Sequence, residues 1–242
     1  MLIDFPILPV LSPRNVLGCV EKKNYGTHKT NFYKMKAKKS CQQRKRVARL
    51  KKREQAIKEY FRSMDRSFFM DKFKNMAFLD EAVPIGHEQT ISQPSLVLEM
   101  TLALELEPDS KVLEIGTGSG FQTALLAEFG NHVYTVERIE ALHTCAKERL
   151  DELGFENISF KLADGSSGWE EHAPYDRIMV TAAASTIPEE LVAQLASGGK
   201  MILPVGSSWS QELRLIEKDR DGKIHSTVLN LVRFVPLKGK YE

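Results

Sequence analysis

An apolar stretch that must turn abruptly into a helix is the feature of this sequence that most restricts its fold. Residues 112–115 form a short strand, Gly116, Gly118 and Gly120 follow, and an apolar helix is expected to run to Phe129. Glycine reaches positive φ without a steric cost and lets a ligand lie against the backbone. The start of the helix then offers free N–H groups. The turn therefore predicts an α/β fold that binds a nucleotide-like ligand at this point.

Strand and helix patterns alternate through the rest of the chain. Such alternation predicts a parallel sheet with helices on both faces. A late hairpin, joined across an Asp-Arg-Asp-Gly turn, adds antiparallel strands at one edge. We therefore expect a doubly wound, Rossmann-like α/β sheet, preceded by a helical region that begins near residue 54. The expected strands are 112–115, 132–136, 158–162, 177–181, 200–204, 212–218 and 227–235, and the expected helices include 139–153 and 188–195.

The spacing of the glycines decides between two kinds of ligand. Dinucleotide-binding turns follow the pattern G-x-G-x-x-G, but Phe121 occupies the position of the last glycine here. Glu114 precedes the turn, where its negative charge is poorly suited to a pyrophosphate. The same charge suits the cationic amino group of a sulfonium amino acid. The pattern thus disfavours a nicotinamide dehydrogenase and favours S-adenosyl-L-methionine as the cofactor.

Two further acids follow the next two strands. Glu137 ends the second strand, where an acid can accept hydrogen bonds from both ribose hydroxyls of a nucleotide. Asp164 and Gly165 follow the third strand, where an acceptor could meet an adenine amino group. Because the carboxyl ends of parallel strands share one edge of the sheet, Glu114, Glu137 and Asp164 are expected to face the same crevice.

Beyond the turn, several blocks resemble the protein-L-isoaspartate O-methyltransferase family, and the resemblance covers about residues 55–238. The Gln-Thr-Ile-Ser-Gln-Pro and Thr-Ala-Ala-Ala stretches are the most particular to it. The resemblance implies methyl transfer from S-adenosylmethionine to the free carboxylate of L-isoaspartyl residues in damaged proteins and peptides. The methyl ester then closes to a succinimide, which reopens partly to aspartate. Besides the turn, the blocks are residues 84–94, 133–138, 173–184, 198–206 and 232–237.

The resemblance also implies roles within the segment 84–94, which is expected to be a loop. Ser92 matches the serine that the family places at the active site, and Thr90 and Ile91 match residues that close over the cofactor. Ser92 also precedes Pro94 in the pattern of a helix N-cap, and both roles can hold at once. Family members usually carry glycine where this chain has Glu88, and this charge is expected to alter the substrate mouth.

The chemistry of the expected reaction explains which motifs are missing. A carboxylate is anionic at neutral pH and a sulfonium methyl group is electrophilic, so the protein must mainly align the reactants and exclude water. Neither a catalytic triad nor a metal is expected, since the six histidines are scattered without ligand spacing.

The N-terminal part of the chain differs in charge from the rest. Residues 1–53 contain 15 Lys and Arg but two Asp and Glu, whereas the remainder contains 19 and 30. We expect a basic, disordered extension over 1–53 and a methyltransferase domain over 54–242. The extension has three open interpretations, which are a nucleic-acid-binding tail, an organelle-targeting segment and a dispensable addition.

We expect a cytoplasmic protein that acts as a monomer. The three cysteines form no CxxC pair, which favours reduced thiols. No secretory signal or membrane-spanning run is expected. Two alternative functions stay open, namely a methyltransferase of the same fold acting on RNA or a small molecule, and an inactive binding module.

Overall fold

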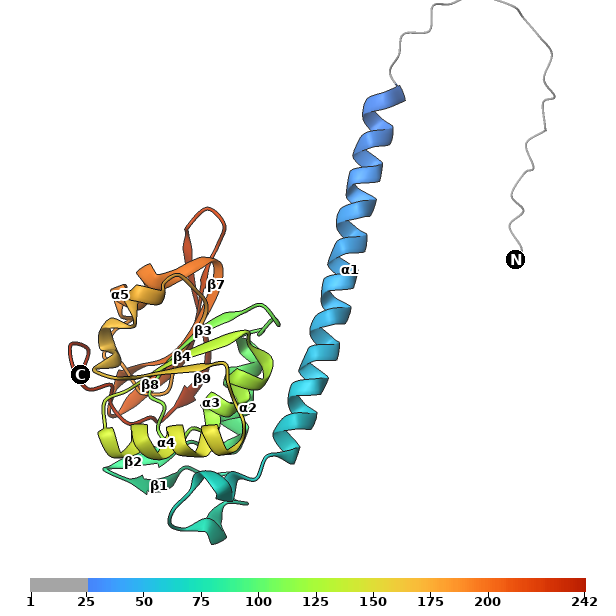
Figure 1. Cartoon of the computed structure of the whole chain (residues 1–242). Helices are drawn as coiled ribbons and strands as arrows, with labels where there is room; N and C mark the ends of the chain where they lie inside the picture. Colours follow the sequence, from blue (N-terminus) through green and yellow to red (C-terminus); the bar gives the residue numbers. More distant parts are fainter. Residues whose placement is uncertain (1–25) are drawn as a thin grey trace, which may run out of the picture. The chain divides into compact units, whose positions relative to one another are not determined.

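The computed structural model describes the backbone of residues 26–242, and the side chains of residues 44–242 other than residue 46. The chain divides after Ala48 into two compact units, and the second, Arg49–Glu242, contains the sheet (Figure 1). Helix α1 (Gly26–Ser63) begins in the first unit and ends in the second. The boundary expected between residues 53 and 54 therefore falls inside a helix.

Helical backbone occupies residues 26–53, where the charge pattern led us to expect disorder. Lys, Arg, Gln and Ala dominate this stretch and all have high helix propensity. A helix that is anchored at its C-terminal end can therefore extend through them despite their like charges. The part of the expectation that concerns residues 1–25 lies outside the described residues.

A seven-stranded sheet in the order β5-β4-β3-β6-β7-β8-β9 forms the centre of the second unit. Its first five strands pair in parallel, and β8 and β9 add antiparallel strands at one edge, as predicted. Successive strands are added on one side of β3 and then, from β6, on the other, which creates a topological switch point. The strands are β3 (Lys111–Ile115), β4 (His132–Glu137), β5 (Ile158–Leu162), β6 (Tyr175–Val180), β7 (Leu195–Ser207), β8 (Ser210–Lys218) and β9 (Ile224–Val232).

Helices cover both faces of the sheet (Figure 1). One apolar cluster joins the end of α1 with α2 (Pro94–Ala103), α3 (Phe121–Phe129) and residues of α4 (Glu140–Glu152). A second cluster joins the other face to α5 (Glu189–Gln194) and to Tyr241 near the C-terminus. Short 3₁₀ helices complete the unit at η1 (Arg66–Phe69), η2 (Lys74–Met76), η3 (Gly165–Ser167) and η4 (Glu170–His172). No helix of the described residues is long and apolar enough to span a membrane.

The segment expected to be a loop is a small hairpin. Strands β1 (Val83–Gly86) and β2 (Gln89–Ile91) pair antiparallel outside the main sheet. Their turn uses positive φ at His87 and Glu88, which are 52° and 59°. Since glycine is the usual residue for such a conformation, the missing glycine hid the hairpin from sequence reasoning.

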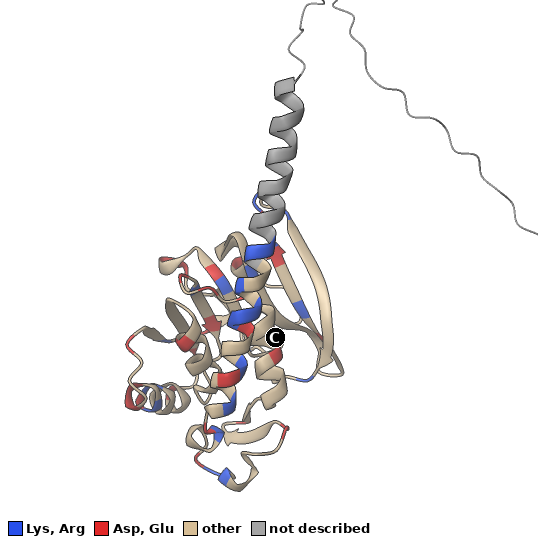
Figure 2. Cartoon of the chain, turned by 90° about the vertical axis from the view of Figure 1, so that its right-hand side faces the viewer, with Lys and Arg blue, Asp and Glu red and all other residues tan. Residues whose placement is uncertain are grey.

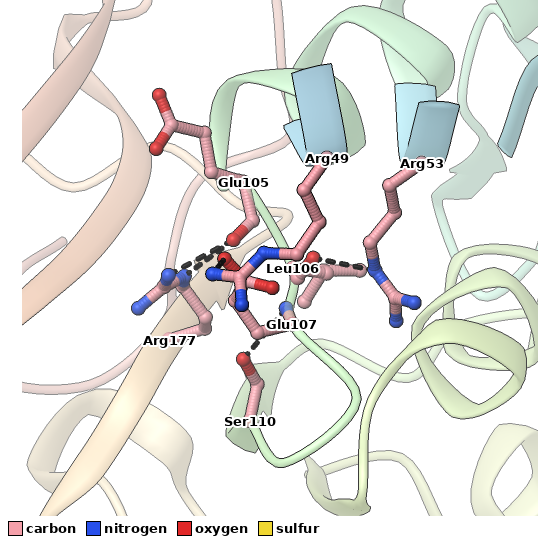
Figure 3. Close-up of polar contacts among 7 residues, drawn as sticks. All are labelled: Arg49, Arg53, Glu105, Leu106, Glu107, Ser110 and Arg177. Atoms are coloured by element: carbon pink, nitrogen blue, oxygen red, sulfur yellow. Dashed lines mark hydrogen bonds and ion pairs between the residues drawn. The ribbon is translucent and has the colours of Figure 1, made fainter. Parts of the chain in front are cut away.

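Two arginines attach the end of α1 to the loops that flank β3 and α3 (Figure 3). Arg53 donates from Nε to the carbonyl of Leu106 at 2.7 Å and from Nη2 to the carbonyl of Phe129. Its guanidinium also lies over the Phe129 ring, 5.5 Å from the centroid. Arg49 pairs with Glu107 at 2.7 Å, but its side chain is 65% exposed. Arg53 is therefore the stronger attachment.

We predict that Arg53→Met lowers the free energy of unfolding by about 2–3 kcal/mol, because two carbonyls lose a charged donor. The matched variant Arg49→Met should cost less than about 1 kcal/mol, since it removes an exposed ion pair. Urea denaturation followed by circular dichroism measures both. Equal losses for the two variants would contradict the assignment of the attachment to Arg53.

Candidate functional site

The glycine turn between β3 and α3 forms the floor of a pocket, here named the turn pocket, at the switch point of the sheet. Gly116, Gly118 and Gly120 have φ of 93°, 56° and 87°. A Cβ at position 116 would overlap the hydroxyl of Thr181, which follows β6. Only glycine therefore allows the backbone to pass here, as the sequence pattern indicated.

Seven of the ten predicted site residues line the turn pocket. They come from β2, from the turn and from the ends of β4 and β5, so the fold brings together segments far apart in the sequence. The three others, Glu114, Gly120 and Asp164, are not among its lining residues. The seven are Thr90, Ile91, Ser92, Gly116, Gly118, Glu137 and Gly165.

The carboxylate of Glu137 joins the two loops that follow β3 and β4. Oε2 accepts from the backbone N–H of Gly118 at 2.9 Å, and Oε1 accepts from those of Arg138 and Ile139, both at 2.9 Å. The side chain is only 5% exposed and lines the pocket. A carboxylate has about four acceptor positions, so Glu137 keeps capacity for one hydroxyl of a ligand while it holds the turn.

Glu114 lies within the sheet rather than against a ligand, and this corrects the contact expected with an amino group. Its Oε2 accepts from the hydroxyls of Thr123 at 2.6 Å and Thr135 at 2.7 Å, and Thr135 in turn lies 2.6 Å from the hydroxyl of Thr117 in the turn. Among the described residues, Oε1 of Glu114 has no partner. Burial is the main cause that raises the pKa of Glu114 to about 8, so the carboxyl is mainly protonated at neutral pH. Strand alternation explains the correction, because Ile115, one position later, faces the pocket instead.

Gly120 and Asp164 do not line the turn pocket but support the elements around it. A Cβ at Gly120, the N-cap of α3, would lie 3.2 Å from the Leu150 side chain of α4, so this glycine lets the two helices pack closely. Asp164 accepts from the backbone N–H of Ser166 at 2.8 Å and thereby caps η3. Its neighbour Gly165 is the residue of the pair that lines the turn pocket.

Arg66 positions the segment that carries Ser92. The guanidinium is only 6% exposed and donates to the carbonyls of Leu79, Glu81 and Ser92 at 3.0, 2.7 and 3.1 Å, with further bonds to Ala77 and Ile91. Five carbonyls from two separate stretches therefore converge on one cation. Sequence reasoning missed this residue, because nothing in its local pattern marks an arginine that will be buried.

The helix-cap interpretation of Ser92 is wrong. Helix α2 begins at Pro94, its N-cap is Gln93, and that residue makes no side-chain cap. The carboxylate of Asp80 accepts from the backbone N–H of Ser95 at 2.8 Å and takes the capping role instead. Ser92 instead lines both the turn pocket and a second cavity, here named the side groove.

The side groove lies between α2 and the strands β8 and β9. It has a volume of about 590 Å³ and shares Thr90, Ser92, Thr181 and Val235 with the turn pocket. The two cavities are therefore adjacent, and Ser92 lines both. Glu88, which was expected to alter a substrate mouth, is exposed in the turn of the β1–β2 hairpin and is not among the residues that line either cavity.

Some pocket residues escaped the sequence interpretation. Arg138 and Ile139 directly follow Glu137, and Lys238 comes from the C-terminal segment. The position of Arg138 and Ile139 after the acid that ends β4 is a usable signal, since residues beyond the carboxyl end of a strand face the crevice. Lys238 has no comparable local signal, because a long-range return of the chain brings it to the pocket.

Burial of Glu114 predicts a pH effect on stability. Its pKa is 4.5 when exposed and about 8 in the fold, so the folded protein holds the extra proton between these values. The contribution of this group to the free energy of unfolding is therefore complete below about pH 4.5 and is lost as the pH rises through 8. In urea unfolding at about pH 5, 7 and 9, Glu114→Gln should gain stability relative to the parent as the pH rises. Exposed Glu128→Gln serves as the control, and parallel curves for Glu114→Gln and the parent would refute the prediction.

The contacts of Arg66 predict that even a conservative substitution is harmful. Lysine carries a single ammonium group, which cannot donate to all the carbonyls that the planar guanidinium of Arg66 reaches. Arg66→Lys should therefore lower the free energy of unfolding by at least about 2 kcal/mol. Exposed Arg62→Lys is the matched control and should change it by less than about 0.5 kcal/mol. Chemical denaturation gives both values, and a neutral Arg66→Lys would show that the carbonyls do not need the fork.

Comparison with known proteins extends these observations. The family model described as protein-L-isoaspartate(D-aspartate) O-methyltransferase matches residues 36–242. A protein-L-isoaspartate O-methyltransferase of Dictyoglomus turgidum is 53% identical over 174 residues, which are 72% of this chain and 79% of that protein. Its counterpart from Pseudomonas paraeruginosa is 50% identical over 183 residues, 75% of this chain and 86% of that protein.

Solved structures agree with these relatives. A Plasmodium falciparum chain crystallised with S-adenosyl-L-homocysteine has a TM-score of 0.62 and 28% identity, and the match covers 72% of this chain and 85% of that one. A structure described as protein-L-isoaspartate O-methyltransferase has a TM-score of 0.68 and 29% identity, covering 79% of this chain and 67% of that one. The family model matches residues 36–242, and a relative is 53% identical. The chain therefore belongs to the protein-L-isoaspartate O-methyltransferase family.

Proposed function

We propose that this chain transfers the methyl group of S-adenosylmethionine to the free carboxylate of L-isoaspartyl residues in damaged proteins and peptides. The observation that carries the proposal is the position of Ser92, where the turn pocket meets the side groove. A donor in the first cavity and a polypeptide in the second would meet at this residue. The two reactants can then be held in line, which is the main requirement of this chemistry.

The turn pocket fits S-adenosylmethionine. Its floor is a backbone cradle that a Cβ at Gly116 would fill, and the carboxylate of Glu137 can accept from a ribose hydroxyl. We propose that Gly116 and Gly118 lie under the donor and that Thr90 and Ile91 cover it. Asp164 and Gly165 would meet the adenine amino group. Glu114 and Gly120 would act indirectly, by holding the turn and the helix behind it.

Ser92 would orient the acceptor. When bound, S-adenosylmethionine supplies an electrophilic methyl group, and the isoaspartyl carboxylate is already ionised at neutral pH. The Ser92 hydroxyl would donate a hydrogen bond to one carboxylate oxygen and leave the other free to attack. The methyl ester product then closes to a succinimide with loss of methanol, and the succinimide opens in part to aspartate.

We further propose a nucleic-acid contact and a cytoplasmic location. Basic residues recur along the described part of α1 (Figure 2), and Lys51 and Lys52 are exposed. Together with the basic sequence of residues 1–53, they support contact with nucleic acid as a second candidate property. A cytoplasmic location is supported by Cys145, whose thiol is free. RNA as the methyl acceptor is a less favoured alternative, because the family relatives are named for a protein substrate.

Labelling with methyl-labelled S-adenosylmethionine tests the function. The parent protein should label an isoaspartyl peptide and leave its aspartyl twin unlabelled. Ser92→Ala should lower kcat/KM by about 10-fold or more through loss of the orienting bond while the Kd for S-adenosylhomocysteine stays unchanged. Glu137→Gln should weaken that Kd instead, because it loosens the turn and removes charge near the ribose.

The matched control for Ser92→Ala is Ser226→Ala, a change of an exposed serine on β9. It should keep full activity. Equal labelling of the two peptides by the parent, or labelling of neither, would refute the proposed reaction. Full activity of Ser92→Ala would refute its orienting role while leaving the reaction in place.

A further inference from the structure

The outer part of the side groove has a chemical character that the reaction itself does not require. Two of its lining residues are apolar and strongly exposed, Trp209 at 93% in the β7–β8 turn and Leu231 at 73% on β9. Single exposed leucines are ordinary on protein surfaces, but a fully exposed tryptophan beside a cavity is not. Tryptophan is also the side chain most enriched at binding hot spots. The two residues therefore indicate an apolar contact at the groove.

The wall that carries these residues is held in place before any ligand arrives. Gln211 is only 5% exposed, accepts from the backbone N–H of Phe234 at 2.6 Å and donates to its carbonyl at 3.1 Å. Across the groove, Asn230 donates to the carboxylate of Glu99 on α2 at 3.4 Å. These bonds tie β8 to the segment after β9 and β9 to α2. The groove is thus formed in advance, which lowers the entropic cost of binding an extended ligand.

The inner end of the groove identifies the occupant. It shares Thr90, Ser92, Thr181 and Val235 with the turn pocket, so the residues that flank a group held at Ser92 lie within reach of the groove. The isoaspartyl side chain of the proposed reaction brings a polypeptide to this point. A volume of about 590 Å³ exceeds what the reacting carboxyl needs and is in the range of small-ligand sites.

We propose that the side groove binds the polypeptide flanking the isoaspartyl residue, and that Trp209 and Leu231 select for a large apolar side chain in that flank. The inference rests on the proposed function and adds a sequence preference to it. Because the groove lies on one side of Ser92, the preference applies to one flank of the isoaspartyl residue. Contact with the groove is remote from the reacting atoms, so it acts on KM rather than on kcat.

Isoaspartyl peptides with Leu, Phe or Ser at each of the two positions on either side of the isoaspartyl residue test the inference. With the full chain, kcat/KM should be about 10-fold higher for Leu or Phe than for Ser at a position of one flank, as burial of one such side chain provides. Trp209→Ser and Leu231→Ser should each reduce this ratio at least about threefold, through KM. Their Kd for S-adenosylhomocysteine should stay unchanged.

Phe78→Ser is the matched control, since Phe78 is 83% exposed and does not line either cavity. It should keep the full preference. An unchanged preference in Trp209→Ser and Leu231→Ser, or an equal preference on both flanks, would overturn the inference. A parent protein that dimerises through Trp209, shown by sedimentation of the parent and Trp209→Ser, would also overturn it in favour of a second copy. Absence of labelling with every isoaspartyl peptide would instead refute the underlying reaction.

Discussion

The geometry of the turn pocket depends on the hydrogen bonds that the carboxylate of Glu137 accepts. This carboxylate accepts backbone hydrogen bonds from the loops after both β3 and β4. Those loops leave neighbouring parallel strands. A buried anion that collects N–H donors from two loops sets the distance between them. The same side chain lies in the turn pocket, so the residue that shapes the site also belongs to its surface.

Arg66 has the opposite charge and fixes the segment that carries Ser92. It collects carbonyls where Glu137 collects N–H groups, and two of those carbonyls belong to Ile91 and Ser92. The acceptor segment is thus attached to η1 and the following loop, rather than to the sheet. Under the proposed function, the donor would rest on the sheet and the acceptor on the N-terminal part of the second unit. Ser92 is where the supports meet.

Sequence patterns predicted the sheet and the turn well, because both depend on local rules. Strand β5 agrees with its expected limits, and the glycines adopt the positive φ that their spacing required. Sequence reasoning failed where the outcome depends on distant partners. The position of Glu114 before the turn predicted a ligand-binding acid, but in the fold its carboxyl group accepts hydrogen bonds from Thr123 and Thr135. The β1–β2 hairpin was missed since its turn contains His87 and Glu88 rather than glycine. Apart from Thr90 and Ser92, the residues of the groove were missed because several stretches that are far apart in the sequence form it.

The two cavities adjoin at Ser92, and this arrangement has a kinetic consequence. The turn pocket has Arg138 and Lys238 among its lining residues, whereas Trp209 and Leu231 belong to the side groove, so their outer parts are formed by different residues. Under the proposed reaction, a spent donor and a methylated polypeptide each have their own way out. Release of one product would then not require release of the other. A long protein with several damaged residues can then stay in the groove while the donor is renewed, so that repair proceeds through more than one site in a single encounter.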